Sequence, residues 1–232
     1  MNMQKHITMK TTRLYTLFAL LMVFAMSCNN QKTTISGHEY VDLGLPSGTL
    51  WATCNVGATM PEEYGDYFAW GETETKETYN WTSYKFCNGG DSTFTKYCCN
   101  SEYGNNGFID TLTILQVNDD PATAWGANWH TPSKTQWEEL IRYTTNKWTT
   151  QNGVKGRVFA ADNGNSLFLP AAGGYSNSWL DDTDSDGIYW SSSLCTGFSN
   201  CAWGMNFYGD SFALLELFRY EGSSVRPVTT LP

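Results

Sequence analysis

Residues 131–143 have the sequence TPSKTQWEELIRY, and this stretch decides the fold class. Ser133 and Gln136 have the spacing of a helix capping box, in which each side chain bonds the backbone N–H of the other residue. Trp137 and Leu140 follow at the spacing of one helix face, so the stretch predicts an amphipathic α-helix. It is the clearest helix signal in the chain.

Short apolar runs bounded by Gly, Asn, Asp and Pro fill most of the remaining sequence, and such runs are typical of strands. A short second helix is predicted over 58–64, with Pro61 at its start and two glutamates in its first turn. One or two helices among many short, mostly antiparallel strands with long loops predict an α+β fold. The predicted strands are 40–45, 49–56, 67–70, 154–160, 166–169, 188–192, 202–207, 212–219 and 224–228, with a hairpin turn at 162–165.

The composition fits one folded domain with an acidic surface. The chain has 232 residues, of which 41% are hydrophobic and 16% charged, which excludes a disordered or low-complexity protein. There are 14 Lys and Arg against 23 Asp and Glu, a net charge of −9. Proteins that bind a phosphate backbone need clustered cations, so nucleic acid is not expected as a partner.

The N-terminus has the pattern of a secretory signal. Residues 1–27 contain Lys5, Lys10 and Arg13 and no acid, followed by an apolar run over 14–26. That run is about 20 Å long as a helix, which is too short for the roughly 30 Å hydrocarbon core of a membrane. The polar residues that follow, up to 36, predict a short tether, and the globular domain is expected over 37–232.

Residues 25–28, Ala-Met-Ser-Cys, resemble the lipobox of bacterial lipoproteins. The resemblance implies that Cys28 is acylated and becomes the mature N-terminus. Residues 28–36 would then be a lipid-anchored tether. Several acyl chains on one residue hold a protein stably on a membrane, whereas a single chain does not. Loss of 1–27 leaves a net charge of −12, so the sequence predicts an acidic, lipid-anchored domain of the cell envelope, at the outer membrane.

Three further blocks resemble one protein family. The first joins EYVDLGLPSGTLWATCN (39–55) to GDYFAWGE (65–72), the second is WHTPSKTQWEEL (129–140), and the third joins YWSSS (189–193) to RYEGSSVRPV (219–228). Together they are similar to the Fibrobacter succinogenes major paralogous domain of Bacteroidetes, a family with a C-type-lectin-like, formylglycine-generating-enzyme-like fold. His130 and Gln136 stand where that family usually has arginine and glutamate.

The resemblance implies a fold whose N- and C-terminal strands pair and whose binding residues lie on one irregular face. It extends to variable proteins diversified by retroelements, in which the changeable positions would correspond to 194–218. That interval mixes aromatic and apolar residues with Ser, Gly and Asn, as binding loops of antibodies do. Its alternation over 212–218 is equally typical of a half-buried core strand, and both interpretations stay open here. On the first of them, the ligand-binding residues are Phe198, Tyr208, Phe212, Leu214, Glu216 and Phe218.

The function expected from these observations is non-catalytic recognition of an extracellular or envelope protein, or of a glycan. The only membrane contact expected is through the N-terminal lipid, and no cofactor is expected. A structural or adhesive surface component without a specific pocket is the alternative. A weaker one is a copper-dependent oxidase like the formylglycine-generating enzymes, which use a close cysteine pair near the C-terminus.

Six cysteines follow Cys28 and allow fifteen pairings. In an oxidising envelope, Cys195 and Cys201 predict a disulfide that closes a short loop, worth about 2 to 3 kcal/mol. Cys87 and Cys98 form a second candidate pair. Zinc is not expected, because no CxxC motif or histidine at metal-ligand spacing accompanies these cysteines.

Asp182, Asp184 and Asp186 precede Gly187 as in the first half of a calcium loop. The twelfth residue of such a loop is Ser193 instead of glutamate, so a solvated acidic turn is favoured over a weak calcium site. No metal is predicted elsewhere. Six tryptophans fall in strand or helix contexts and are expected in the core: Trp51, Trp70, Trp125, Trp129, Trp137 and Trp190.

Overall fold

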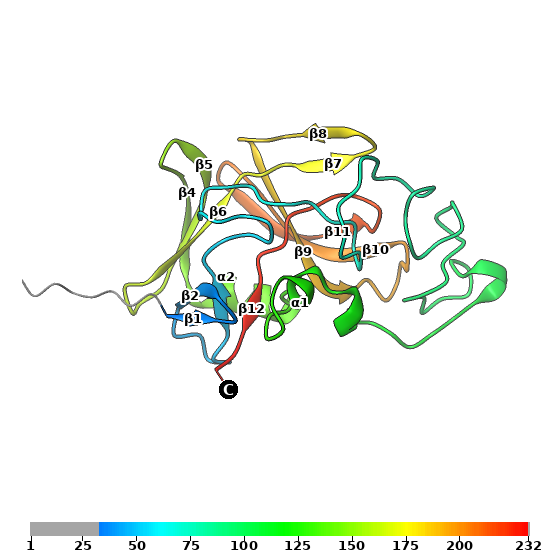
Figure 1. Cartoon of the computed structure of the whole chain (residues 1–232), viewed down its shortest axis with the longest axis horizontal. Coiled ribbons are helices and arrows are strands. Elements are labelled where there is room, and N and C mark those ends of the chain that lie inside the picture. Colours follow the sequence, from blue (N-terminus) through cyan, green and yellow to red (C-terminus); the bar gives the residue numbers. More distant parts are fainter. Residues whose placement is uncertain (1–32, 232) are drawn as a thin grey trace, which may run out of the picture. The chain divides into compact units, whose positions relative to one another are not determined.

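Residues 33–231, the part of the chain that the computed structural model describes, contain two α-helices, two short 3-10 helices and twelve strands (Figure 1). This composition confirms the predicted class, α+β with many small antiparallel pairings. In chain order the elements are β1 (Thr34–Ile35), β2 (His38–Asp42), β3 (Leu50–Ala52), η1 (Asn105–Gly107), η2 (Val117–Asp119), α1 (Pro121–Trp125), α2 (Lys134–Tyr143), β4 (Thr145–Gln151), β5 (Val154–Ala160), β6 (Ser166–Pro170), β7 (Gly174–Ser176), β8 (Trp179–Asp181), β9 (Asp186–Leu194), β10 (Cys201–Tyr208), β11 (Ser211–Phe218) and β12 (Val228–Thr229).

The strands form four small sheets, in the orders β1-β2-β3-β12, β11-β10-β9, β4-β5-β6 and β7-β8. Every pairing between named strands is antiparallel. The first sheet joins both ends of the described chain, since Val228 of β12 is the register partner of Trp51 in β3. Terminal strands therefore share a sheet, as expected.

Helix α2 begins with the predicted capping box. Ser133 Oγ accepts the backbone N–H of Gln136 at 3.2 Å, and Gln136 Oε1 accepts the backbone N–H of Ser133 at 2.9 Å. Trp137 and Leu140 on one face of the helix are fully buried. Gln136 Nε2 also lies 3.4 Å from His130 Nε2, so the two side chains are in polar contact.

The second predicted helix, 58–64, is wrong. The Glu63 carboxylate accepts the backbone N–H groups of Thr59 at 2.7 Å and Met60 at 3.1 Å, which closes an isolated turn. The Glu63 side chain thus bonds the backbone N–H groups before it, and this local turn forms in place of a continuing helix. Gly65 follows with φ of +73°, a conformation outside the helical region.

Several strand predictions need correction. The run 67–70 contributes only an isolated bridge at Phe68. The run 224–228 contributes an isolated bridge at Ser224 and the first residue of β12, Val228. Strand β4 and the β7–β8 hairpin were not predicted, since β4 is largely polar and β7 and β8 have three residues each. The turn at 162–165 between β5 and β6 is confirmed, with Gly164 at φ of +88°.

The chain's start also differs from the expected boundary. Thr34 and Ile35 already pair with β2, so folded structure begins before Gly37. The signal segment 1–27 and Cys28 lie outside the described residues. Within the described range, no helix is long and apolar enough to cross a membrane.

Aromatic side chains fill two cores. One surrounds Trp70, Trp129 and Trp190, and the other surrounds Trp51 and Trp137. These five tryptophans are at most 2% exposed, which confirms their predicted core position. Trp125 was predicted with them and is only partly buried.

Two buried arginines tie distant parts of the chain together. The Arg219 guanidinium donates to the Tyr84 hydroxyl and to the carbonyls of Tyr97, Ser199 and Lys96. Neither Arg219 nor Arg226 has an ion pair in the part of the chain described by the structure. Backbone carbonyls and aromatic faces therefore replace a carboxylate around Arg219, whose Cζ lies 4.4 Å from the Phe94 ring centroid.

Candidate functional site

The predicted recognition interval, 194–218, lies on the outside of the protein. The side chains of Phe198, Tyr208, Phe212 and Phe218 are between 37% and 55% exposed, and Glu216 is exposed as well. Leu214 is half-buried against the second core. Most of these side chains are therefore exposed and do not lie in the core. Whether they bind a ligand stays a prediction.

Strand β11 displays these side chains because it is the outer strand of its sheet. Only β10 pairs with it among the described residues, in a continuous register from Cys201↔Phe218 to Tyr208↔Ser211. A two-residue turn joins the strands, with Gly209 at φ of +46° as a tight hairpin of this kind requires. In Figure 1 the orange strands β9 and β10 cross the middle of the molecule, with β11 beside β10.

Buried Arg157 fixes the turn end of β11. Its guanidinium donates to the carbonyls of Gly209 at 2.7 Å and Ser211 at 3.3 Å. The guanidinium carbon lies 4.9 Å from the centroid of the Phe212 ring, within the range of a cation–π contact. Phe212 is thus held in place from the core side while its outer part remains exposed.

An aromatic cluster extends the surface at the other end of β11. The Phe218 ring stacks on Tyr220 with centroids 5.8 Å apart, and Trp81 meets Tyr220 edge-on at 4.7 Å. The sequence analysis missed Trp81 and Tyr220, because Trp81 lies more than one hundred residues from β11 in the chain. It also missed Leu215, which is 43% exposed. We use the name outer face for the region around β11, which includes side chains from both sides of the strand: Trp81, Phe198, Tyr208, Phe212, Leu214, Leu215, Glu216, Phe218 and Tyr220.

The loop that carries Phe198 is closed by backbone bonds, from Cys195 N to Cys201 O at 3.1 Å and from Cys201 N to Phe198 O at 2.9 Å. Both thiols are free. Burial first, and then the Glu216 carboxylate, raise the pKa of Cys195 to about 12 and that of Cys201 to about 11. Thiolate is the form that attacks substrates and binds metals, so these surroundings do not favour copper chemistry at this pair.

The other four described cysteines are also free thiols: Cys54, Cys87, Cys98 and Cys99. The sulfurs of Cys87 and Cys98 point to separate carbonyl partners, Trp81 O at 3.1 Å and Asn100 O at 3.2 Å. The structure thus shows no disulfide within the described residues. The pairs Cys195–Cys201 and Cys87–Cys98 stay predictions for the oxidised protein.

Residues 182–185 of the acidic segment form the exposed turn between β8 and β9, and Asp186 is the first residue of β9. Asp184 Oδ1 accepts the hydroxyl of Tyr64 at 2.9 Å. Over residues 33–231, no group of three or more His, Cys, Asp or Glu side chains is placed to hold a metal ion. The three aspartates therefore do not converge as the ligands of a calcium loop would.

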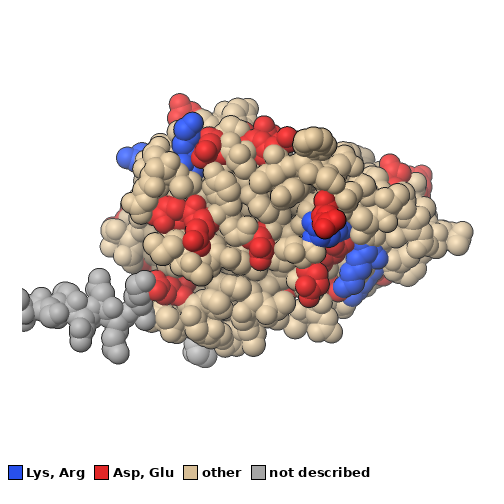
Figure 2. All heavy atoms as spheres, turned by 45° about the horizontal axis from the view of Figure 1, so that its top comes forward, with Lys and Arg blue, Asp and Glu red and all other residues tan. Residues whose placement is uncertain are grey.

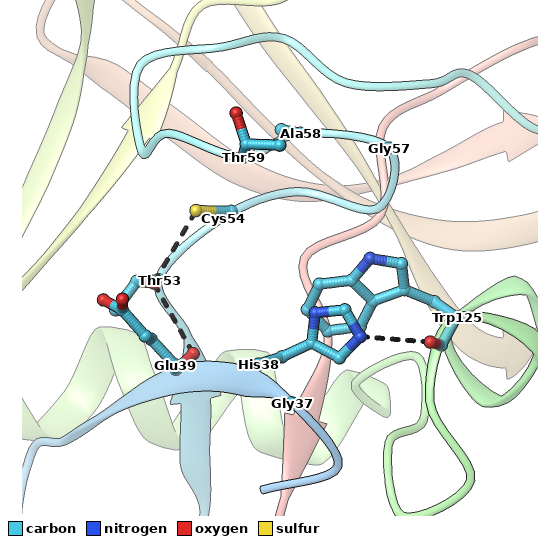
Figure 3. A pocket seen from close by; sticks show the side chains of 9 residues that line it. All are labelled: Gly37, His38, Glu39, Thr53, Cys54, Gly57, Ala58, Thr59 and Trp125. Atoms are coloured by element: carbon cyan, nitrogen blue, oxygen red, sulfur yellow. Dashed lines mark hydrogen bonds between the residues drawn. The ribbon is translucent and has the colours of Figure 1, made fainter. Parts of the chain in front are cut away.

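A separate hollow of about 410 Å³ lies near the chain's start (Figure 3). The His38 imidazole stacks on Trp125, and its Nε2 lies 3.1 Å from the Trp125 carbonyl. The Cys54 sulfur, on another wall, contacts Thr53 Oγ1 at 3.6 Å. Thiol and imidazole thus have different partners and do not form the nucleophile–base pair that cysteine catalysis uses. The lining residues are Gly37, His38, Glu39, Thr53, Cys54, Gly57, Ala58, Thr59 and Trp125.

Acidic groups predominate on one face of the surface (Figure 2). Figure 2 shows red carboxylates spread over the viewed face, with few blue cations between them. Glu216 makes no ion pair or side-chain hydrogen bond in the described chain. It is a single charge in the middle of an otherwise uncharged strand, SFALLELF (211–218).

Glu221 lies just beyond the outer face, and its carboxyl is largely buried. Burial raises its pKa from 4.5 to about 7, and a hydrogen bond with the Phe218 backbone offsets this only in part. The unfolded chain thus releases this proton at lower pH than the folded chain. The protonated Glu221 carboxyl therefore contributes to the free energy of unfolding at low pH, and this contribution is lost as the pH rises from about 4.5 to about 7.

We therefore expect Glu221→Gln to stabilise the protein by about 1 to 3 kcal/mol at pH 8 and to have little effect at pH 4. Urea unfolding at the two pH values measures the difference. Glu77→Gln, at an exposed glutamate, is the matched control and should show no such pH dependence. Equal effects of Glu221→Gln at both pH values would contradict the prediction.

Comparisons with protein-family models, curated proteins and solved structures give no match to this chain.

Proposed function

We propose that this protein is a non-catalytic recognition protein that binds another macromolecule through the outer face. The observation that carries the proposal is the exposure of apolar and aromatic side chains along β11 and its adjoining loop. Several large exposed apolar side chains on one strand and its adjoining loop are typical of a surface that binds another molecule. Rigid aromatics with small polar neighbours suit recognition, because aromatic side chains lose little conformational entropy on binding.

The finer features proposed with this function come from the sequence. They are a C-type-lectin-like fold, lipid attachment at Cys28, and a position at the cell envelope, at the outer membrane. Two observations support the α+β class: the strands form small sheets, and strands from both ends of the described chain share one sheet. An anchored domain with an acidic surface would present the outer face to extracellular or envelope partners, a protein or a glycan.

A structural or adhesive component without a specific site is the second candidate. It predicts that exposed apolar residues contribute to binding wherever they lie. Ile109 and Val117, at 60% and 70% exposure, offer the comparison, because both are well separated from β11 in the chain. Specific recognition predicts instead that only the outer face matters.

The test compares two surface variants of the full chain on arrays of glycans and of envelope proteins. Phe198→Ser, Phe212→Ser and Phe218→Ser are combined in one variant, and Ile109→Ser and Val117→Ser in the other. Every partner of the wild-type chain is expected to bind the first variant at least tenfold more weakly and the second unchanged. Equal losses in the two variants, or no loss in the first, would overturn the proposal.

A further inference from the structure

The open edge of β11 has a defined set of free backbone groups. In an antiparallel pair, alternate residues direct both N–H and C=O toward the partner strand. Arg219 N donates to Asn200 O at 3.1 Å, one step beyond the last pair of the β10–β11 register. Odd-numbered residues of β11 therefore bond β10, and the even-numbered residues direct their N–H and C=O groups away from it.

Three of these residues leave their outward groups open. The Phe218 carbonyl is taken by the backbone N–H of Glu221 at 3.0 Å, which closes that end of the edge. For Phe212, Leu214 and Glu216, no partner of the outward N–H and C=O groups occurs within residues 33–231. The edge thus offers three donors and three acceptors over a length of about 14 Å.

Such an edge is unusual in a protein that stays in solution. Soluble proteins normally protect edge strands with lysine, proline, bulges or very short strands. Strand β11 is eight residues long, has no proline or bulge, pairs regularly with β10 and carries one charge, Glu216. Its surroundings therefore suit the addition of a further strand.

The charge of Glu216 indicates which kind of strand can pair with the open edge of β11. A second copy of the chain would bring its own net charge of −9 to this edge. With full antiparallel overlap of the three open residues, Glu216 would face Phe212 of the second copy, and a shift by four residues would place the two Glu216 side chains opposite each other. Neither register neutralises the carboxylate, and opposed like charges destabilise strand pairs.

We propose that β11 binds an extended peptide segment by β-strand addition. The segment pairs antiparallel or parallel with the open edge, places apolar side chains beside Phe212 and Leu214, and sets a lysine or arginine opposite Glu216. This inference rests on the proposed function and specifies the partner as a protein segment recognised mainly through its backbone. It does not specify the side chains on the opposite face of the added strand.

The probe is a displayed library of random eight-residue peptides, selected on the full chain. Each selected peptide is then made with one backbone amide methylated at a time. Methylation removes a donor and adds bulk, so affinity is expected to fall at least tenfold at every second position and to stay unchanged at the positions between. This period of two is specific to strand addition, and it needs no change in the protein.

Two variants of the protein complete the test. Glu216→Pro removes an outward N–H without removing a bond to β10, so the strand remains paired, and peptide affinity is expected to fall at least tenfold. Glu216→Gln keeps the N–H and removes only the charge. It should weaken binding of lysine- or arginine-containing peptides about threefold or more and should reduce the salt dependence of their binding.

The outcomes separate this inference from the proposed function. Peptides that lose affinity with the Phe198, Phe212 and Phe218 serine variant, but show no period of two and tolerate Glu216→Pro, would overturn strand addition and leave recognition by the outer face. Selection of no peptide would likewise overturn strand addition. Concentration-dependent dimerisation that Glu216→Pro abolishes would overturn the peptide partner in favour of a second copy.

Discussion

Arg219→Met is expected to lower the free energy of unfolding by about 3 to 5 kcal/mol, because it leaves several backbone carbonyls without their donor, each at a cost of about 1 to 3 kcal/mol. The side chain is fully buried, and four of its hydrogen bonds go to Tyr84, Lys96, Tyr97 and Ser199. Methionine fills much of the space but donates nothing. The carbonyls of Lys96, Tyr97 and Ser199 would then lose these bonds without access to water.

The size of this effect follows from the position of Arg219 in the fold. The residues it bonds lie in the irregular segment before η1 and in the loop that carries Phe198. Neither segment has a long strand or helix of its own, so each depends on contacts with the core. The guanidinium supplies directional bonds to both, and the rings of Trp70 and Phe94 cover its faces at 5.0 and 4.4 Å.

Arg142→Met is the matched control. Arg142 is exposed in the last turn of α2, where its loss removes only a favourable charge near the helix end, at about 0.3 to 1 kcal/mol. Denaturant-induced unfolding under reducing conditions measures both variants. Arg219→Lys, which retains the charge without the planar fork, should fall between wild type and Arg219→Met and serves if the methionine variant does not fold. If the free energy of unfolding of Arg219→Met lay within about 1 kcal/mol of that of the control, the stabilising role of Arg219 would be refuted.

The sequence was sufficient where local chemistry determines the structure. The capping box at Ser133 and the turn at 162–165 need only neighbouring residues, and both are present as predicted. The false helix at 58–64 shows the limit of such rules, because Glu63 bonds the backbone N–H groups that precede it. The role of Arg219 depends on residues more than one hundred positions away, so no local pattern contains it.

The outer face likewise has features that the sequence predicts and features that it does not. Alternation over 212–218 correctly predicted a strand, but a period of two cannot distinguish an exposed edge from a core strand. That difference is set by which strands pair, and β11 is exposed because no described strand follows it in the sheet. Trp81 and Tyr220 could not be assigned to this surface from the sequence, since their contact with Phe218 exists only in the folded chain.

Gly187→Ala is expected to destabilise the protein by about 2 to 3 kcal/mol through overpacking. A Cβ at this position would lie 2.0 Å from Cζ of Phe207, and the Phe207 ring is fully buried and stacked on Tyr189. The ring can yield only by displacing other core side chains. Thermal unfolding and denaturant unfolding both report the loss.

Calcium addition and Asp182→Asn test the two interpretations of the acidic turn. In a calcium loop, Gly187 would serve the conformation of the loop, and calcium would stabilise the wild-type chain. We expect instead that calcium leaves the midpoint of unfolding unchanged and that Asp182→Asn has little effect. Calcium-dependent stabilisation that Asp182→Asn removes would restore the calcium site.

A double-mutant cycle identifies the physical cause. Phe207→Leu alone should destabilise the protein, because it removes part of a buried aromatic side chain. In the Gly187→Ala background it should cost less by about 1 kcal/mol or more, since the smaller side chain makes room for the new methyl group. Strict additivity of the two changes would show that Gly187 is needed for another reason. Coupling would show that the glycine in this acidic segment is required by a ring of β10, in the sheet that carries the outer face, and that its likeness to a metal-binding loop has no bearing on its role.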